Sequence, residues 1–144
     1  MENNNLDEFK IAEKFDHTEL LVWKEKKAIL IRATAPYIPM EEFKEVFTKA
    51  TEIIGRERLT KTIFDKTQLT VFHQPSMEWY FIVWKEELLT KYGVRMHRKI
   101  LPDNNVFVQS VKLGRMKIEK NFPDGKYKEM DVQYAKSVME AVEM

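Results

Sequence analysis

Apolar residues alternate with polar ones near the start of the chain and recur at helical spacing further on. Residues 18–23 and 27–33 are rich in β-branched and large apolar side chains, and the polar residues 24–26 separate them. This pattern predicts an antiparallel β-hairpin. Residues 9–15 have apolar side chains two or four positions apart, which predicts a short edge strand before the hairpin.

The segment after the hairpin has apolar residues at steps of three and four, which is typical of a helix with one buried face. Pro39 stands at its start, and Glu41 and Glu42 lie in the first turn, where the helix dipole favours acidic side chains. Gly55 can adopt the left-handed conformation that ends a helix. We therefore predict a helix from Pro39 to Gly55.

Strands and helices alternate over the rest of the chain. They are predicted as a strand over 59–64, a helix over 75–92, a strand over 94–101, a helix over 104–120, a strand over 126–130 and a helix from Asp131 to about 142. Strands that alternate with helices form parallel neighbours in a sheet. The sequence thus predicts an α/β fold with an N-terminal β-hairpin and a mixed, mostly parallel sheet with about four helices.

Size and composition narrow the class of protein. The chain has 144 residues, which fits a single domain over 1–144, and residues 1–6 are expected to be disordered. The net charge of +1 does not favour a nucleic-acid partner. No apolar run approaches the ~18 residues of a membrane span. The acidic N-terminus differs from a secretory signal, so we expect a cytoplasmic protein.

The order of elements and several residues at their junctions resemble the STAS/SpoIIAA-like family. The residues that carry the resemblance are Trp23, Phe64, Asp65, Leu69, Pro75, Ser76, Trp79, Trp84 and Asp131 at the start of a C-terminal helix. The resemblance covers roughly residues 18–143. It implies a SpoIIAA-like fold and a regulatory protein–protein interaction module.

Phosphorylation-switched members of that family carry a serine at the start of the second helix, after an aspartate that ends a strand. The resemblance implies that Asp65 matches this aspartate and that Ser76 is the candidate phosphorylation site. The segment His73–Ser76 stands in place of the Asp-Ser-Ser-Gly-like junction of those members. The chain therefore resembles more closely the small, uncharacterised single-domain bacterial branch of the family.

Two structural alternatives accompany these candidates. Ser76 lies in the first turn of its helix, where its hydroxyl can satisfy free backbone N–H groups without any phosphorylation. Asp65 ends a parallel strand and is expected at the crevice where α/β sheets bind ligands, with His73 in the same loop system. A lone carboxylate at that place can equally organise the loop by accepting backbone hydrogen bonds.

The helix predicted over 75–92 is apolar on more than one side. Trp79, Tyr80, Val83 and Trp84 give it an aromatic and apolar surface wider than one core-facing stripe. Aromatic side chains are enriched at protein interfaces. Three uses of these residues stay open: packing in the core, self-association, or lining a groove for an apolar ligand.

Residues 91–128 contain many more basic than acidic residues. Lys112, Arg115 and Lys120 are expected to project from the third helix, near Arg95 and Lys99 on the preceding strand. Such a patch can bind an acidic partner or an anionic ligand. It can also be an ordinary solvated face.

The sequence carries no recognisable catalytic machinery. It has no cysteine, no glycine-rich phosphate loop and no histidine pair at metal-ligand spacing. We therefore expect no enzyme, no metal and no cofactor. The expected function is a non-enzymatic regulatory interaction module, with a protein partner or self-association. The alternative is a carrier of a small apolar, lipid-like ligand.

Overall fold

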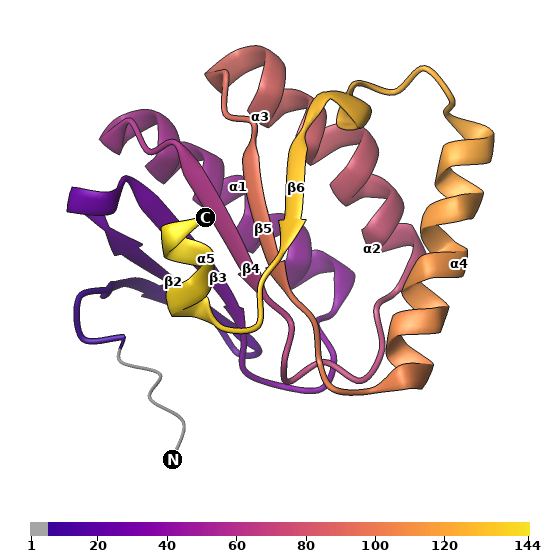
Figure 1. The fold of residues 1–144 in the computed structure, drawn as a ribbon, viewed down its shortest axis with the longest axis horizontal. Coiled ribbons are helices and arrows are strands. Elements are labelled where there is room, and N and C mark those ends of the chain that lie inside the picture. The colour runs from indigo at the N-terminus through magenta and orange to yellow at the C-terminus, as the bar shows by residue number, and fades with distance from the viewer. Residues whose placement is uncertain (1–5) are drawn as a thin grey trace.

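One mixed β-sheet with helices on both faces forms the framework of the molecule (Figure 1). The computed structural model describes residues 6–144. The disorder predicted for residues 1–6 falls on residues 1–5, which lie outside the described residues, and on Leu6. The Leu6 side chain is half-buried and packs against the smaller core cluster.

Six strands follow one another across the sheet in chain order. They are β1 (Lys10–Lys14), β2 (Thr18–Trp23), β3 (Ala28–Ala33), β4 (Lys61–Asp65), β5 (Met96–Ile100) and β6 (Asp131–Tyr134). The first three strands pair antiparallel, and β3 to β6 pair parallel. A short 3-10 turn, η1 (Lys24–Lys26), closes the hairpin, with Lys27 in the left-handed conformation. The predicted hairpin and mostly parallel sheet are confirmed.

The helices form two layers of unequal size. They are α1 (Met40–Glu57), α2 (Gln74–Trp79), the π-helical turn η2 (Tyr80–Trp84), α3 (Lys85–Tyr92), α4 (Asn105–Asn121) and α5 (Val138–Glu143). The elements α2, η2 and α3 form one continuous helix, as the sequence predicted. Together with α1 and α4 it covers one face of the sheet, and α5 covers the other (Figure 1). None of the helices in the described chain is both long and apolar enough to cross a membrane.

The larger core lies between the sheet and the α1 side and is dominated by aromatic rings. Tyr80 stacks on Trp84 with ring centroids 5.4 Å apart, and Phe47 meets Trp84 edge-on at 4.8 Å. The Trp84 indole N–H donates to the Phe47 carbonyl oxygen at 3.0 Å. Aromatic pairs of this kind add about 0.5–1.5 kcal/mol each beyond the area they bury. The continuous helix is therefore held against α1 by specific ring contacts.

The predicted end of the first helix at Gly55 is wrong. The helix α1 continues to Glu57, and Arg58 takes the left-handed cap conformation. A Cβ atom added at Gly55 would lie 2.6 Å from Cε1 of Tyr92. Gly55 thus allows α1 and the end of α3 to approach closely, which a local sequence pattern does not reveal.

The final strand and the final helix lie later in the chain than the sequence predicts. Residues Lys126–Glu129 form a 3-10 turn (η3), and β6 begins at Asp131, whose N–H donates to the Arg95 carbonyl oxygen. Asp131 pairs with Arg98 at 3.2 Å and caps no helix. The cap of α5 is Ser137, whose hydroxyl accepts the Glu140 N–H.

We predict that Gly55→Ala lowers the free energy of unfolding, although alanine is normally the better helix residue. The new methyl group meets the Tyr92 ring, and overpacking of this kind costs about 1–3 kcal/mol. In a Tyr92→Ala background the same change is expected to stabilise by about 0.5–1 kcal/mol. Urea denaturation of the four proteins measures both effects. Equal effects in both backgrounds would contradict the close approach.

Candidate functional site

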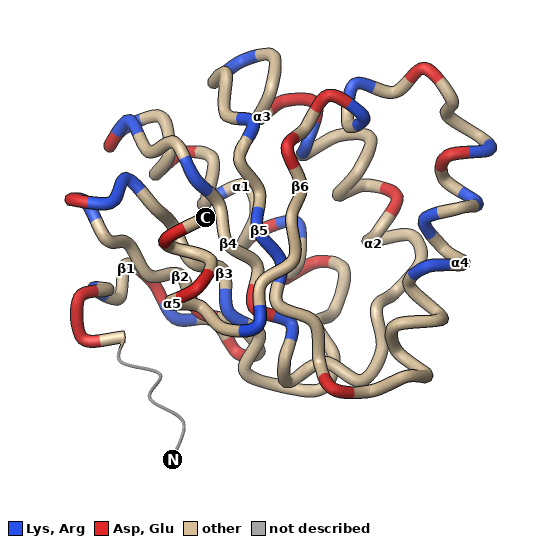
Figure 2. Tube along the Cα trace, in the orientation of Figure 1, with Lys and Arg blue, Asp and Glu red and all other residues tan. Residues whose placement is uncertain are grey.

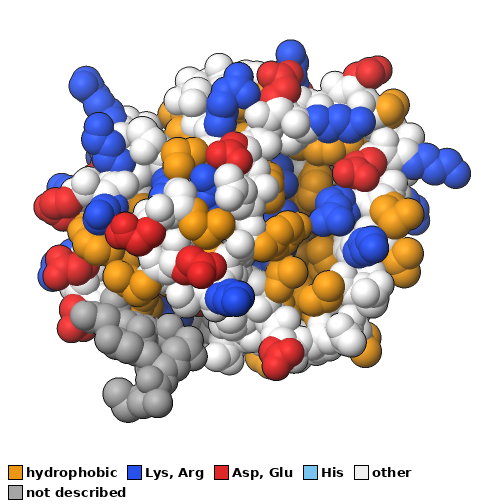
Figure 3. Space-filling view, viewed as in Figure 1, with side chains coloured by type: hydrophobic (Ala, Val, Ile, Leu, Met, Phe, Trp, Pro, Cys, Tyr) orange, Lys and Arg blue, Asp and Glu red, His pale blue; other side chains and the backbone are white. Residues whose placement is uncertain are grey.

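A pocket of about 550 Å³ opens between β6, the continuous helix and α4. Figure 3 shows a hollow to the right of centre with a hydrophobic floor and Lys and Arg side chains along its border. The lining residues combine aromatic rings with cations: Phe81, Lys85, Lys99, Arg115, Glu119, Tyr127, Lys128, Val132 and Tyr134. Among these lining residues, Glu119 alone is acidic. The pocket thus offers positive charge beside apolar surface.

Three lysines lie buried around the floor of this pocket. Lys66, Lys85 and Lys99 have relative exposures of 1%, 2% and 3%. Each comes from a different element, since Lys66 directly follows β4, Lys85 begins α3 and Lys99 lies on β5. Lysine is almost never fully buried without a partner. This clustering is therefore the most unusual feature of the structure.

No acidic partner neutralises these amines. In the described part of the chain, exposed lysines such as Lys24 form ion pairs, whereas Lys66, Lys85 and Lys99 form none. On the opposite face of the sheet, which α5 covers, a buried lysine does have hydrogen-bond partners. There the Lys61 amine donates to the carbonyl oxygens of Ala141, Val142 and Met144 at 3.2, 2.7 and 2.6 Å. Buried cations are thus partnered on the α5 face and unpartnered by acids on the α4 face.

Aromatic rings surround the three amines. The Lys66 Nζ lies 5.0 Å from the Phe72 ring centroid, and the Lys85 Nζ lies 3.8 Å from that of Phe81. The Lys99 Nζ lies 5.2 Å from the Phe81 centroid. A desolvated cation over a ring gains about 2 kcal/mol. That gain is smaller than the several kcal/mol that each buried ion loses in hydration.

Burial is the largest cause that lowers the pKa values of all three lysines. At Lys66 and Lys85 the charges of neighbouring lysines and Arg115 lower the pKa further, whereas at Lys99 only the Arg115 charge does so. The pKa of Lys99 falls to about 8, and those of Lys66 and Lys85 lie well below 10.5. The Lys85 and Lys99 amines lie close to each other, and their interaction lowers the pKa of Lys85 and opposes the fall of the Lys99 pKa.

A chain of buried hydrogen bonds fixes the Tyr80 ring, against which the Lys85 and Lys99 amines lie. The Tyr80 hydroxyl is hydrogen-bonded to Nε2 of His97, and Nδ1 of His97 lies 2.6 Å from the Thr62 hydroxyl. Burial, then Lys85, Lys99 and Lys66, keep the pKa of His97 well below 6.5. A neutral His97 can thus hold Tyr80 in place without adding a further charge to the lysine cluster.

At the rim of the pocket, a hydrogen bond links α4 to the edge strand β6. The Arg115 guanidinium donates to the Tyr134 hydroxyl at 3.0 Å, which bridges the mouth of the pocket. Figure 2 shows the basic positions along β5 and α4 that flank this region. The predicted proximity of Arg115 and Lys99 is confirmed by their shared pocket. Lys112 and Lys120 are exposed and do not line it.

Asp65 ends the parallel strand β4 as predicted, but neither it nor His73 belongs to the pocket between β6 and α4. Asp65 accepts the Thr67 N–H at 3.0 Å and lies 4.0 Å from Arg32, so it organises its own loop. His73 contacts the Ser76 hydroxyl at 3.1 Å and the Tyr37 ring. Neither residue lines the lysine pocket.

Ser76 is 1% exposed, and its hydroxyl faces His73. A kinase cannot reach a serine buried in this way unless the start of α2 opens. Among the hydrogen bonds of the described residues, the one that the Ser76 hydroxyl makes is to the His73 ring, so it serves a side chain and not a free backbone N–H of α2.

The four residues proposed for an interface differ widely in their exposure. Tyr80 and Trp84 are 0% and 1% exposed and belong to the core, so they are not available to a partner. Trp79 is half-buried and packs edge-on against Phe43. Val83 alone of the four is well exposed, at 48%. Core packing is thus the use that the structure shows for Tyr80 and Trp84.

Sequence reasoning missed Lys66 and Lys85. Lys85 lies four residues after Phe81 and three before Leu88, which is core-facing spacing in a helix. A lysine at such a position was the available signal.

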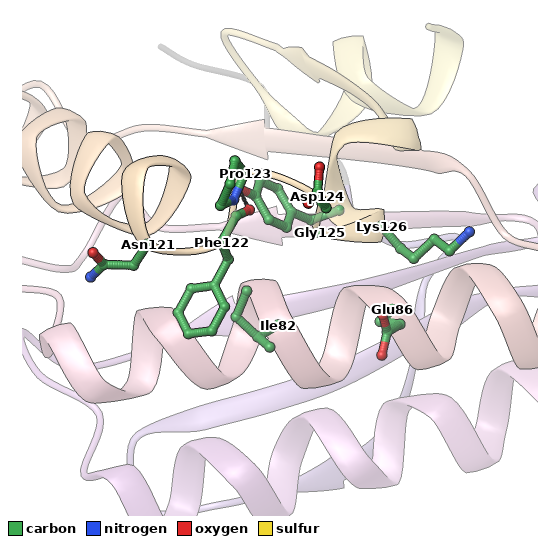
Figure 4. Close-up of a pocket in the computed structure, with 9 residues that line it drawn as sticks. Ile82, Glu86, Asn121, Phe122, Pro123, Asp124, Gly125 and Lys126 are labelled. Carbon is green, nitrogen blue, oxygen red and sulfur yellow. Dashed lines mark hydrogen bonds between the residues drawn. The ribbon is translucent and has the colours of Figure 1, made fainter.

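A second pocket of about 340 Å³ lies under the loop after α4, between Ile82 and Phe122 (Figure 4). Its charged lining residues, Glu86, Asp124 and Lys126, are exposed, and within residues 6–144 no group of acidic or histidine side chains is placed to hold a metal.

We predict that the free energy of unfolding rises as the pH increases from 8 to 10.5. The Lys99 pKa is about 8 in the folded protein and 10.5 in the unfolded chain, so the unfolded chain binds more protons in this window. Lys99 accounts for a rise of about 3 kcal/mol. Urea denaturation is expected to show a smaller rise in Lys99→Met, and greater stability of this variant at pH 7.

The exposed Lys117 offers a matched control. Lys117→Met should keep the wild-type dependence on pH, because its amine is hydrated in both states. Parallel curves for wild type and Lys99→Met would contradict the assignment.

Neither a protein-family model, nor a curated protein, nor a solved structure matches this chain. The structure establishes an α/β fold with a six-stranded mixed sheet.

Proposed function

We propose that this protein is a non-enzymatic binding module for a small organic anion, which occupies the pocket between β6 and α4. The observation that carries the proposal is the set of buried amines without acidic partners. Lys85 and Lys99 line the pocket directly, and Lys66 adds positive charge behind them. A bound carboxylate or phosphate would replace the hydration that these amines lack.

The pocket also suits an apolar part of the ligand. Phe81, Tyr127 and Val132 provide apolar lining beside the amines. Its volume of about 550 Å³ lies within the range of ~300–1,000 Å³ that is usual for small-molecule sites. We therefore infer an anion with an aromatic or aliphatic body. This modifies the expected carrier of a purely apolar ligand, because the floor carries charge.

The fold agrees with the element order of STAS/SpoIIAA-like proteins, and we propose membership of that family on this ground alone. The regulatory role that the resemblance implies stays a prediction. In this proposal the occupancy of the pocket, instead of phosphorylation of the buried Ser76, would be the signal that a partner reads. Arg115 on α4 and Tyr134 on β6 are placed to respond to a ligand at the rim.

We expect phenyllactate or phenyl phosphate to stabilise the protein at pH 7, whereas benzyl alcohol, which lacks the charge, does not. A ligand at 100 times its Kd stabilises by about 2.7 kcal/mol. Thermal unfolding at constant ionic strength measures the shift in Tm. The two anions distinguish a carboxylate site from a phosphate site.

Lys99→Met is expected to lose most of this shift while the free variant unfolds at a higher temperature than wild type. Lys117→Met, the exposed control, should keep the full shift. Equal shifts in wild type and Lys99→Met, or no shift with either anion, would overturn the proposal.

A further inference from the structure

We infer that Lys85 is a nucleophilic amine that captures aldehydes or ketones bearing a carboxylate or phosphate group, forming an imine in the pocket. This inference rests on the anion site proposed above and identifies the chemical class of its ligand. Three features of the geometry carry it: the position of Lys85 in the pocket, the absence of an acidic partner and the adjacent Lys99.

Lys85 differs from ordinary surface lysines in its surroundings. Its side chain is 2% exposed, yet it lines the pocket, and its Nζ lies over the Phe81 and Tyr80 rings at 3.8 and 4.8 Å. Lysines are activated as nucleophiles when they are desolvated in an apolar pocket or lie beside another cation. Lys85 meets both conditions. Burial and the charges of Lys99 and Lys66 lower its pKa, which raises the fraction of free amine near neutral pH.

The other two buried lysines have different positions and roles. Lys66 does not line the pocket, so a ligand cannot reach its amine directly. Lys99 lines the pocket and has a pKa of about 8, so near neutral pH it remains largely protonated. Its ammonium lies beside Lys85 and is placed to donate a proton to a carbonyl oxygen. Arg115 at the rim is then available for the anionic group of the ligand.

The proposed reaction is a condensation that needs no oxidant or reductant. The free electron pair of the Lys85 nitrogen forms a C–N bond to the carbonyl carbon, while the carbonyl oxygen takes a proton from Lys99. The resulting carbinolamine loses its C–O bond, and the oxygen leaves as water with a second proton, originally on the Lys85 nitrogen. The nitrogen and carbon are then joined by a double bond. Hydrolysis by one water molecule reverses the sequence.

Phenylpyruvate and phenyllactate form a matched pair of probes, because only the former has a ketone. The protein is incubated with phenylpyruvate and sodium cyanoborohydride, which adds hydride to the imine carbon and makes the bond permanent. Intact-mass spectrometry and peptide mapping are expected to show one predominant adduct, at Lys85. Excess phenyllactate should slow its formation by occupying the same pocket.

Variants separate this inference from the anion proposal. Lys85→Met is expected to lose the adduct, and Lys99→Met to form it at least tenfold more slowly. Lys117→Met should label at Lys85 at the wild-type rate. Thermal stabilisation by phenyllactate is measured on the same proteins and reports anion binding alone.

Phenyllactate stabilisation without a Lys85 adduct would overturn the imine and leave the anion site standing. A Lys85 adduct without phenyllactate stabilisation would support the nucleophile and overturn the anion proposal. Labelling spread evenly over exposed lysines, together with no stabilisation, would overturn both.

Discussion

Packing of aromatic rings between the sheet and the α2–η2–α3 helix is the contact on which the other features of the structure depend. Tyr80 lies at its centre, stacked on Trp84 and hydrogen-bonded to His97. The π-helical turn places Tyr80, Phe81 and Trp84 together in the core, and π-turns of this kind recur at functional sites. Because Lys85 follows this turn directly, the position of its amine is set by the same packing.

The two faces of the sheet treat buried cations in different ways. On the α5 face, Lys61 donates to backbone carbonyl oxygens and Arg98 pairs with Asp131. On the α4 face, Lys85 and Lys99 lie against aromatic rings with no carboxylate beside them. Removing ions from water costs several kcal/mol each, whereas domains have only about 5–15 kcal/mol of net stability. This contrast between the two faces is the observation on which the proposed anionic ligand rests.

Much of the fold followed from local patterns in the sequence. The hairpin, the strand before it, the helix capped by Gly93 and the helix capped by Asn104 all lie where alternation, helical spacing and cap residues predicted them. The last strand and helix did not, because Asp131 is a good helix cap by type but pairs with Arg98 across the sheet. Gly55 likewise has the residue type of a helix end but serves close packing against Tyr92.

Periodicity and composition can be read along the chain, so they were enough to predict the α/β class, the mostly parallel sheet and the excess of positive charge around β5 and α4. They also predicted that Arg115 and Lys99 lie in one basic region. Which of these charges are buried follows from the packing of the whole fold. Lys66, Lys85 and Lys99 come from three separate elements, and their amines meet only because strand pairing and aromatic packing bring those elements together. Burial depends on every neighbour in space, so spacing along the chain could indicate a buried Lys85 but could not show that the three amines meet.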